Sequence, residues 1–400
     1  MNKLADKHVL FLPRWYPNHY DPMLGLFIKY HAEAISNTIK VSVLYAQAAT
    51  DISSKYSIDL KTENQVYTVR VYYKPCSSKT PIIIAPLVKA FRFLSAMEKG
   101  YRNIMMNVGK PNIVHVHVLT RLGLIAYLLK IFRGIPYLIT EHWSRYLPET
   151  GTFNGSVRKM LTRLAVRNAV AVTTVTDNLK QAMIAHGLKN RKYLILPNVV
   201  DTAKFKPSKN NTDHDKIRFI HVSCFEDRSK NISGILNTLA RLSEIRQDFE
   251  CFFVGVGMDF EIMKNKADKL NLLNKNVFFT GLLEGDEISN IISSVDFMIL
   301  FSNYENMPVV INEAFACGIP VVSSRVGGIP EYVKEETGIL VEPGNENDFL
   351  EKIIHMMDHF SEYDKSKIRK FAVESFSKEA ITKQLINLYA HILSGEKRRE

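Results

Sequence analysis

Two glutamates stand eight residues apart in the C-terminal part of the chain, at Glu305 and Glu313. At a sugar-binding site, one carboxylate can hydrogen-bond hydroxyls and stabilise positive charge that develops on a reacting carbon. A second carboxylate can accept hydrogen bonds from the diol of a ribose. Two solvated glutamates on an amphipathic helix would show the same spacing, but glycine- and proline-containing motifs follow at 318–322 and 327–331. This context favours a ligand-binding site over a solvated helix face.

The elements that position these glutamates follow from local patterns. The apolar run 295–301 predicts a buried parallel strand, and Pro308 suits the first turn of a helix. Glu305 then lies in a loop at the carboxyl end of a strand, where open α/β sheets bind ligands. The backbone N–H groups of Met307 and Val309, at the start of the helix, would face an anion such as a diphosphate.

Short apolar runs alternate with helical patterns along the whole chain, which is typical of doubly wound parallel sheets. The predicted strands of the first series are 8–13, 39–45, 112–117, 137–140 and 170–175. Those of the second series are 217–223, 250–255, 276–279, 297–301, 320–322 and 338–341. A polar stretch separates the two series and reads as a linker. The predicted organisation is an N-terminal domain at 1–205, a linker at 206–216, a C-terminal domain at 217–375 and a final helical segment at 376–400.

The stretch from Glu305 to Glu331 resembles the E-x7-E region of retaining, nucleotide-sugar-dependent glycosyltransferases of family 4, which have the GT-B fold. Further segments resemble that family in the same order along the chain. They are 15–29 with Gly25, 136–142 with His142, 196–201 with Asn198, 255–257 with Gly255, and 278–281 with Gly281. The resemblance implies two Rossmann-like doubly wound parallel-sheet domains that face each other across a cleft. The N-terminal domain would bind the acceptor, and the C-terminal domain would bind a nucleotide sugar. The final segment would cross back to the first domain.

The resemblance also implies roles for single residues. Glu305 would bind the hydroxyls of the donor sugar and stabilise an oxocarbenium-like state, and Glu313 would bind the ribose. His142 would lie close to the donor sugar and take part in the chemistry. Gly25 and Asn198 would belong to the acceptor and phosphate loops. Both double displacement and front-face departure of the leaving group remain open as mechanisms of retention.

Lys230, which is expected at the start of a helix, matches the family's lysine for the donor diphosphate. The sequence departs from the family nearby, since Phe225 stands where an arginine is common, and Arg228 is the candidate for the second cation. Met307 and Pro308 stand where many members have Phe-Gly. Gly255 and Gly281 would lie in the base-binding region.

No metal or other cofactor is expected, since GT-B enzymes of this kind generally work without one. One segment, in the polar linker, resembles the metal-binding pattern Asp-x-Asp; it is Asp213-His-Asp215. His115 and His117 share one face of a strand, but no third ligand stands at metal spacing beside them.

At 400 residues, of which 46% are hydrophobic, the chain can form two domains of ordinary size. The four cysteines contain no C-x-x-C pair, so neither a disulfide framework nor a zinc site is indicated, and a reducing cytosol fits. The N-terminus lacks the pattern of a signal peptide, and no run of about 18 apolar residues is present. We therefore expect a cytoplasmic protein, soluble or peripheral on the inner face of the cell membrane.

The net charge of +11 is concentrated in the basic region 64–140, which holds eleven lysines and arginines and one acid, Glu98. Within it, 82–94 mixes aliphatic and cationic residues, a composition that suits contact with anionic lipid headgroups. A solvated basic face over the sheet is the alternative. No recognition motif supports nucleic acid as a partner.

The expected function is the transfer of a sugar, with retention, from a UDP- or GDP-linked donor to a glycan or polyprenyl-linked acceptor in cell-surface polysaccharide biosynthesis. A nucleotide-sugar epimerase with the same fold is one alternative. A non-catalytic module that binds glycans or membranes is another, and the departures at Phe225 and Met307 leave it open.

Overall fold

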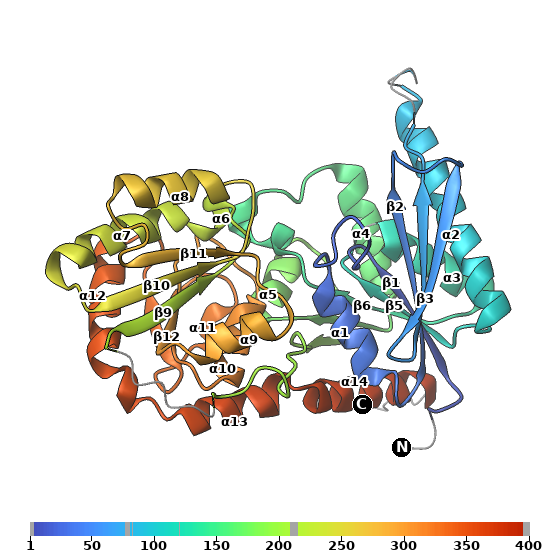
Figure 1. The fold of residues 1–400 in the computed structure, drawn as a ribbon. Helices are drawn as coiled ribbons and strands as arrows, with labels where there is room; N and C mark the ends of the chain where they lie inside the picture. The colour runs from blue at the N-terminus through green and yellow to red at the C-terminus, as the bar shows by residue number, and fades with distance from the viewer. Residues whose placement is uncertain (1–3, 77–80, 82, 120, 209–214, 395–400) are drawn as a thin grey trace.

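The computed structural model describes residues 4–76, 81, 83–119, 121–208 and 215–394, and these form two α/β domains that lie side by side (Figure 1). Each domain has its own sheet, one of eight strands and one of six. The two-domain parallel-sheet fold predicted from the sequence is confirmed. Ile82, most of the polar linker (209–214) and the last six residues of the expected C-terminal segment lie outside the described residues.

The N-terminal sheet has the strand order β3-β4-β2-β1-β5-β6-β7-β8, and every neighbouring pair is parallel except β3 with β4. Its strands are β1 (His8–Pro13), β2 (Lys40–Ala48), β3 (Tyr56–Glu63), β4 (Val66–Tyr73), β5 (Ile113–His117), β6 (Tyr137–Glu141), β7 (Ala171–Thr174) and β8 (Tyr193–Ile195). The sequence-based prediction missed β3, β4 and β8. A two-residue turn joins β3 to β4, and Asn64 and Gln65 adopt φ angles of 48° and 63° there, as a tight hairpin requires.

Helices cover both faces of this sheet. Alternate residues of β1 face opposite ways, so that Val9 and Phe11 pack under α1 and α14 while Leu10 and Leu12 pack under α2, α3 and α4. The helices of the N-terminal part are α1 (Leu26–Ile35), α2 (Ala85–Asn107), α3 (Arg121–Arg133), α4 (Ser156–Asn168) and α5 (Asp177–Ala185), with 3-10 turns η1 (Ser144–Tyr146) and η2 (Pro148–Thr150).

The C-terminal sheet is parallel throughout, with the order β11-β10-β9-β12-β13-β14. Its strands are β9 (Ile217–Val222), β10 (Phe249–Val254), β11 (Val277–Gly281), β12 (Phe297–Leu300), β13 (Val321–Ser324) and β14 (Gly338–Val341). All six lie where the sequence predicted them. The central residues of β9, β10, β12 and β13 are apolar and largely buried, as expected for strands with helices on both sides, whereas the outermost strands β11 and β14 are half-buried at their centres.

Short connections link these strands to the helices of the C-terminal part. They are α6 (Asp227–Lys230), α7 (Ile232–Ile245), α8 (Phe260–Lys269), α9 (Gly285–Ser293), α10 (Val309–Ala316), α11 (Ile329–Tyr332), α12 (Glu346–His359), the 3-10 turn η3 (Phe360–Glu362), α13 (Lys365–Phe376) and α14 (Lys378–Ser394). None of the helices in the described part of the chain combines the length and hydropathy that a membrane span requires.

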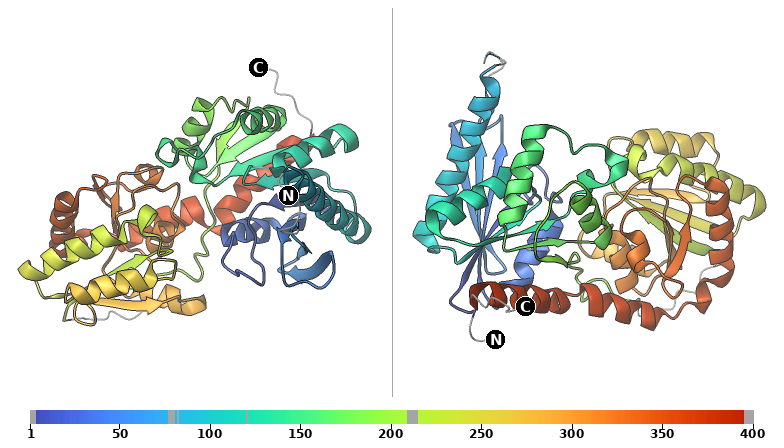
Figure 2. Two further views of the ribbon diagram at one scale, coloured as in Figure 1. Left: turned by 90° about the horizontal axis from the view of Figure 1, so that it is seen from above. Right: turned by 180° about the vertical axis from the view of Figure 1, so that it is seen from behind.

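The chain passes between the domains a second time at α13 and α14, which run along one side of the molecule (Figures 1 and 2). α14 packs on α1 through Ile381, Leu385 and Tyr389, which are fully buried. At the crossing, the N–H of Val200 donates to the carbonyl of Phe376 at 2.9 Å.

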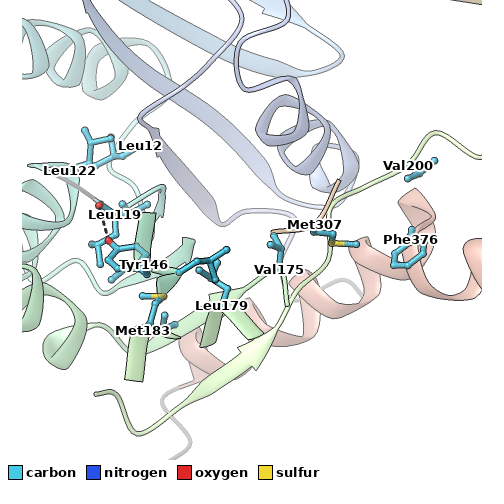
Figure 3. Close-up of a cluster of buried hydrophobic side chains, with 14 of the residues drawn as sticks. Leu12, Leu119, Leu122, Tyr146, Val175, Leu179, Met183, Val200, Met307 and Phe376 are labelled. Carbon is cyan, nitrogen blue, oxygen red and sulfur yellow. Dashed lines mark hydrogen bonds between the residues drawn. The ribbon is translucent and has the colours of Figure 1, made fainter. Parts of the chain in front are cut away.

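The apolar core also continues from one domain to the other (Figure 3). Leu179 and Val175 of the N-terminal side lead to Met307 and Phe376 of the C-terminal side. Because buried side chains of both domains belong to one cluster, the residues at the domain boundary are held in a defined arrangement.

Candidate active site

Lys230 and Glu305 form an ion pair in the C-terminal domain. The Nζ of Lys230 lies 2.5 Å from Oε1 of Glu305, and the two side chains are only 16% and 10% exposed. Ser302 Oγ donates to the same carboxylate oxygen at 3.0 Å. Burial lowers the pKa of the Lys230 ammonium, but its neighbours, Glu305 first among them, together outweigh burial, so that the pKa stays above its ordinary value. Lys230 therefore remains charged.

The backbone places this pair at the edge of the sheet. β12 ends at Leu300, and Glu305 lies in the loop that follows, as predicted. Lys230 is the last residue of the four-residue helix α6, so the expectation that it starts a helix was wrong. The reason is Asn231, whose φ of 49° separates α6 from α7. This break turns the lysine towards the Glu305 loop.

The helix α10 starts one residue later than expected, with Pro308 as its N-cap residue at φ −68°. The first backbone N–H groups of a helix have no partner within it, and here they belong to Val309 and its neighbours. Met307 is buried, and its side chain joins the core between the domains. The start of α10 can therefore accept an anion beside the Lys230–Glu305 pair.

Glu313 lies one turn further along α10 and faces a different environment. Its side chain is half-buried, and burial raises the pKa of the carboxyl to about 7, against the opposing effect of Lys204. The two glutamates of the motif therefore differ, since Glu305 is bonded to Lys230 and no residue in the described part of the chain forms an ion pair with Glu313.

His142 belongs to a buried chain of hydrogen bonds in the N-terminal domain. Its Nδ1 lies 3.1 Å from Oδ1 of Asn198, and its Nε2 lies 3.1 Å from Nδ1 of His117. If both histidines carry their hydrogen on Nδ1, His117 donates to Nε2 of His142, and His142 donates to Oδ1 of Asn198. Burial lowers the pKa of His117 and of His142 well below the ordinary range, so both rings are neutral at neutral pH. Asn198, expected in a phosphate loop, is buried and oriented towards this histidine.

Glu141 holds the loop that carries His142. The backbone N–H groups of His142 and Trp143 each donate to its Oε1 at 2.9 Å, and the N–H of Leu119 donates to its Oε2 at 2.8 Å. Burial raises the pKa of this carboxyl to about 7, and the three N–H groups oppose that rise. The carboxylate therefore fixes the backbone of the histidine loop.

Asn306 connects the two halves of the site. Its Nδ2 donates to the carbonyl oxygen of His142 at 2.8 Å, and its Oδ1 accepts from Thr176 Oγ1 at 2.9 Å. Its side chain is buried. Because Asn306 follows Glu305 directly, this amide fixes the position of the glutamate relative to the histidine loop. We call the contact formed by His142, Thr176 and Asn306 the interdomain junction.

Glu331 strengthens the same junction from the neighbouring helix α11. Its two carboxylate oxygens accept from the backbone N–H groups of Asp177 and Asn178, at 2.8 and 2.7 Å, so that it caps α5 of the other domain. Gly328 allows the close approach, since a Cβ there would lie 2.2 Å from Thr176 Cγ2. A Cβ at Gly327 would lie 1.8 Å from the carbonyl oxygen of Glu305.

The glycines predicted at the site are needed for backbone geometry. Gly25 precedes α1 at φ 67°, and a Cβ there would lie 2.3 Å from the carbonyl oxygen of Trp15. Gly255 follows β10 at φ 125°, where a Cβ would meet the carbonyl oxygen of Ser223 at 2.0 Å. Gly281 ends β11 at φ 76° with open space around it, so only its backbone conformation favours glycine.

The structure therefore brings Lys230, Glu305 and the start of α10 together, and it ties this group to His142 through Asn306. Arg228 lies two residues from Lys230 with an exposed side chain. Phe225 is fully buried against the rings of Phe260 and Phe279, so its position supplies core packing and no charge.

Three histidines from distant parts of the sequence form a cluster that was not predicted. His31, His117 and His142 each offer a ring nitrogen within 4.8 Å of the others, whereas the sequence showed no third ligand at metal spacing beside His115 and His117. The three come from α1, β5 and the loop after β6, and no spacing rule joins such distant positions. Both nitrogens of His31 lie 3.0 Å from backbone carbonyl oxygens, and only Nε2 of His117 lacks a partner among the described residues. A metal ion would have to displace these hydrogen bonds.

Two family models match the chain. The model described as "Glycosyl transferase 4-like domain" matches residues 62–199, and the model described as "Glycosyl transferases group 1" matches residues 202–386. The matches follow the two domains and include every charged residue of the candidate site.

Similar proteins of known name include N-acetyl-alpha-D-glucosaminyl L-malate synthase of Bacillus anthracis, which is 26% identical over 302 residues, or 72% of this chain and 76% of that protein. Sulfoquinovosyl transferase of Arabidopsis thaliana is 28% identical over 262 residues, or 61% and 49%.

Solved structures share the fold. Sucrose-phosphate synthase from Thermosynechococcus elongatus has a TM-score of 0.78 at 19% identity, covering 98% of this chain and 100% of that one. Anabaena HepE in complex with UDP has a TM-score of 0.72 at 17% identity, covering 96% and 99%. The chain belongs to the glycosyl transferases group 1 family and is a transferase enzyme with the GT-B fold.

Proposed function

We propose that this enzyme transfers a sugar, with retention, from a UDP- or GDP-linked donor to a glycan or polyprenyl-linked acceptor in cell-surface polysaccharide biosynthesis. We place the activity in the cytoplasm, without a metal or other cofactor and without nucleic acid as a partner. A similar structure that contains UDP supports a nucleotide-sugar donor.

The observation that carries this proposal is the Lys230–Glu305 pair at the start of α10. A departing nucleoside diphosphate develops negative charge, which a lysine and free backbone N–H groups at a helix start stabilise. When the donor binds, the ammonium group of Lys230 forms an ion pair with the diphosphate and weakens its ion pair with Glu305. The Glu305 carboxylate is then available to the hydroxyls of the sugar. Glu313, which has no such cation, accepts hydrogen bonds from the ribose, and Arg228 extends from α6 as a second cation for the diphosphate.

The N-terminal domain supplies neutral hydrogen-bonding groups on the other side of the sugar. His142 is held by Glu141 through the backbone of its loop and by the hydrogen bonds of its ring to Asn198 and His117, which fix the orientation of the ring. Because both ring nitrogens take part in these bonds, a sugar hydroxyl reaches Nε2 by replacing His117. The neutral imidazole then orients the hydroxyl without repelling a cationic transition state. The loop at Gly25 lies on the acceptor side.

The first test is a thermal-shift series with nucleoside diphosphates and nucleotide sugars on the purified protein and on Glu313→Ala. We expect one base family to raise the melting temperature of the wild type, and this shift to be lost in the variant. No shift with any nucleotide would contradict the proposal and favour a non-catalytic module.

Catalysis is then tested by nucleotide release. A transferase releases the nucleotide faster when an acceptor is present, and the anomeric configuration of the product, read by NMR, reports retention. Interconversion of the nucleotide sugar without any acceptor would instead identify an epimerase. An inverted product would refute retention while leaving sugar transfer intact.

A further inference from the structure

We propose that the outer surface of α2, α3 and α4 binds an anionic lipid bilayer. The three helices pack on the same face of the N-terminal sheet. α2 and α3 form the side of the molecule farthest from the C-terminal domain (Figures 1 and 2). The inference goes beyond sugar transfer, because binding to a bilayer requires neither donor nor acceptor.

Apolar side chains form a stripe along each of these helices, on the side that faces solvent. They share a helical spacing of three or four residues, so they lie on one face of their helix. The exposed members are Ile84, Leu87, Phe91 and Leu94 at α2, Leu128, Ile131 and Phe132 on α3, and Val157, Met160 and Leu164 on α4. Phe132 is 75% exposed and Leu87 is 71% exposed. We call this surface the outer face.

The charges on the same three helices are almost all positive. They carry eleven lysines and arginines and one acid, Glu98, which is bonded to Arg102 at 2.7 Å. The cations are Lys89, Arg92, Lys99 and Arg102 on α2, Arg121, Lys130 and Arg133 on α3, and Arg158, Lys159, Arg163 and Arg167 on α4. Apolar side chains flanked by cations match the interface of a bilayer, where hydrocarbon lies beneath anionic headgroups.

A hollow of about 400 Å³ opens between α2 and α3. Leu94 and Tyr101 line it from α2, and Leu128 and Phe132 line it from α3. Its largely apolar walls suit the hydrocarbon part of a lipid, so the outer face combines exposed stripes with a recess between them.

The charge distribution favours lipid over other occupants. A second copy of this chain would bring the exposed cations of these helices, such as Lys89, Arg133 and Arg158, close to their own copies, and like charges would repel. Single-stranded nucleic acid would be expected to stack its bases on aromatic rings, whereas the stripes are mainly aliphatic. An anionic bilayer satisfies both the positive charge and the aliphatic side chains.

The structure also changes which residues are assigned to this contact. The sequence predicted a contact through the whole basic region 64–140, but Arg70 is buried and bonded to the carbonyl oxygen of Pro17 and to Asp59. Conversely, α4 lies outside that region and contributes one of the three stripes. The proposed lipid-binding surface therefore excludes Arg70 of β4 and includes α4, which the basic region 64–140 did not contain.

The experiment is cosedimentation of the whole protein with vesicles of neutral phosphatidylcholine, with and without phosphatidylglycerol. We expect binding only to the anionic vesicles, and a decrease when salt rises from about 0.1 M to about 0.5 M. The double variant Leu87→Ser with Phe91→Ser should reduce binding by about tenfold. The matched control, Met258→Ser with Ile262→Ser, changes two exposed apolar residues of the C-terminal domain and should bind like the wild type.

Melting temperatures of both double variants show that each remains folded, and nucleotide shifts report the donor site separately. Equal binding by the wild type and the Leu87–Phe91 variant would overturn the proposal, and so would absence of binding to anionic vesicles. A dimer in gel filtration that this variant dissociates, without vesicle binding, would identify a second copy as the occupant. Binding of an RNA oligonucleotide in place of vesicles would identify nucleic acid.

Discussion

The two domains contribute chemically different halves to the candidate site. The C-terminal half carries charge, with Lys230 and Glu305 bonded to each other and Glu313 one turn into the next helix. The N-terminal half carries buried imidazoles, His117 and His142, whose pKa values burial lowers well below the ordinary range.

The difference shows what burial does to an ionisable group with and without a partner of opposite charge. Lys230 remains charged because Glu305 and other neighbours compensate its burial, whereas burial without such a partner makes the rings of His117 and His142 neutral. A charged group can stabilise the negative charge of a leaving diphosphate, whereas a neutral hydrogen-bonding group is sufficient to orient a hydroxyl. In the proposed function, the C-terminal domain therefore supplies electrostatic stabilisation and the N-terminal domain supplies positioning.

Removal of the charged half should have the largest effect. We expect Glu305→Ala to reduce kcat by about 100-fold while donor affinity changes little. Because the variant leaves Lys230 buried without its carboxylate, it should also lose roughly 3 kcal/mol of unfolding free energy. Steady-state kinetics and chemical denaturation measure the two effects.

The control is Glu342→Ala, which removes an ion pair at 3.3 Å between two exposed side chains and should cost less than about 1 kcal/mol. Equal changes in kcat and donor affinity for Glu305→Ala and Glu313→Ala would contradict the proposed division between the two glutamates.

The connection between the halves is tested by Asn306→Ala. The change leaves the carbonyl of His142 without its donor, and the hydroxyl of Thr176 without its acceptor while it still accepts from the N–H of Leu179, so we expect a loss of about 1–3 kcal/mol. Since the amide positions Glu305 relative to the histidine loop, kcat should fall by about tenfold with the donor KM nearly unchanged. Asn303→Ala changes an exposed asparagine in the same loop and is the control; identical kinetics of the two variants would refute a positioning role.

The two domains also differ in how well their fold could be predicted. The six strands of the C-terminal sheet are short, mainly apolar runs, including the half-buried outermost strands β11 and β14, so composition alone located them. β3 is exposed along most of its length, and β8 has only three residues, so neither has an apolar run to detect. The hairpin between β3 and β4 also lacks the usual turn glycine, since Asn64 and Gln65 occupy it.

At the site, motifs predicted which residues matter but not what they touch. Lys230 and Glu305 are separated by 75 positions, and the cap that Glu331 provides to α5 spans 154. Contacts of this kind depend on how the two domains meet, and no local pattern records that geometry. No sequence pattern predicted the role of Asn306, whose contacts with His142 and Thr176 lie in the other domain. Its position directly after Glu305 is the only indication that the sequence offers.

Stability should depend on pH through Glu313. Its pKa is raised from 4.5 to about 7 in the folded state, so the carboxyl contributes stability that is fully present below pH 4.5 and is lost as pH rises through 7. Because the side chain is partly exposed, we expect a decrease of about 1–2 kcal/mol between these limits. Glu313→Gln should remove this part of the pH dependence in denaturation experiments, whereas Glu346→Gln, at the start of α12, should retain it. If the unfolding free energies of the wild type and of Glu313→Gln changed with pH in parallel, the raised pKa of Glu313 would be contradicted.

The smallest expected effect concerns the neutral half. Since burial keeps the rings of His117 and His142 neutral, kcat at saturating donor should show no change around pH 6.5, where an unburied histidine titrates. The donor KM, by contrast, should change as Glu313 titrates near pH 7, because its carboxylate and carboxylic acid forms bind a ribose diol differently. A pH profile of both constants in the wild type and in Glu313→Gln separates the two halves. An acidic limb of kcat near pH 6.5 that persists in Glu313→Gln and disappears in His142→Gln would show that the histidine half carries charge during turnover, and the contrast between the domains would then have to be abandoned.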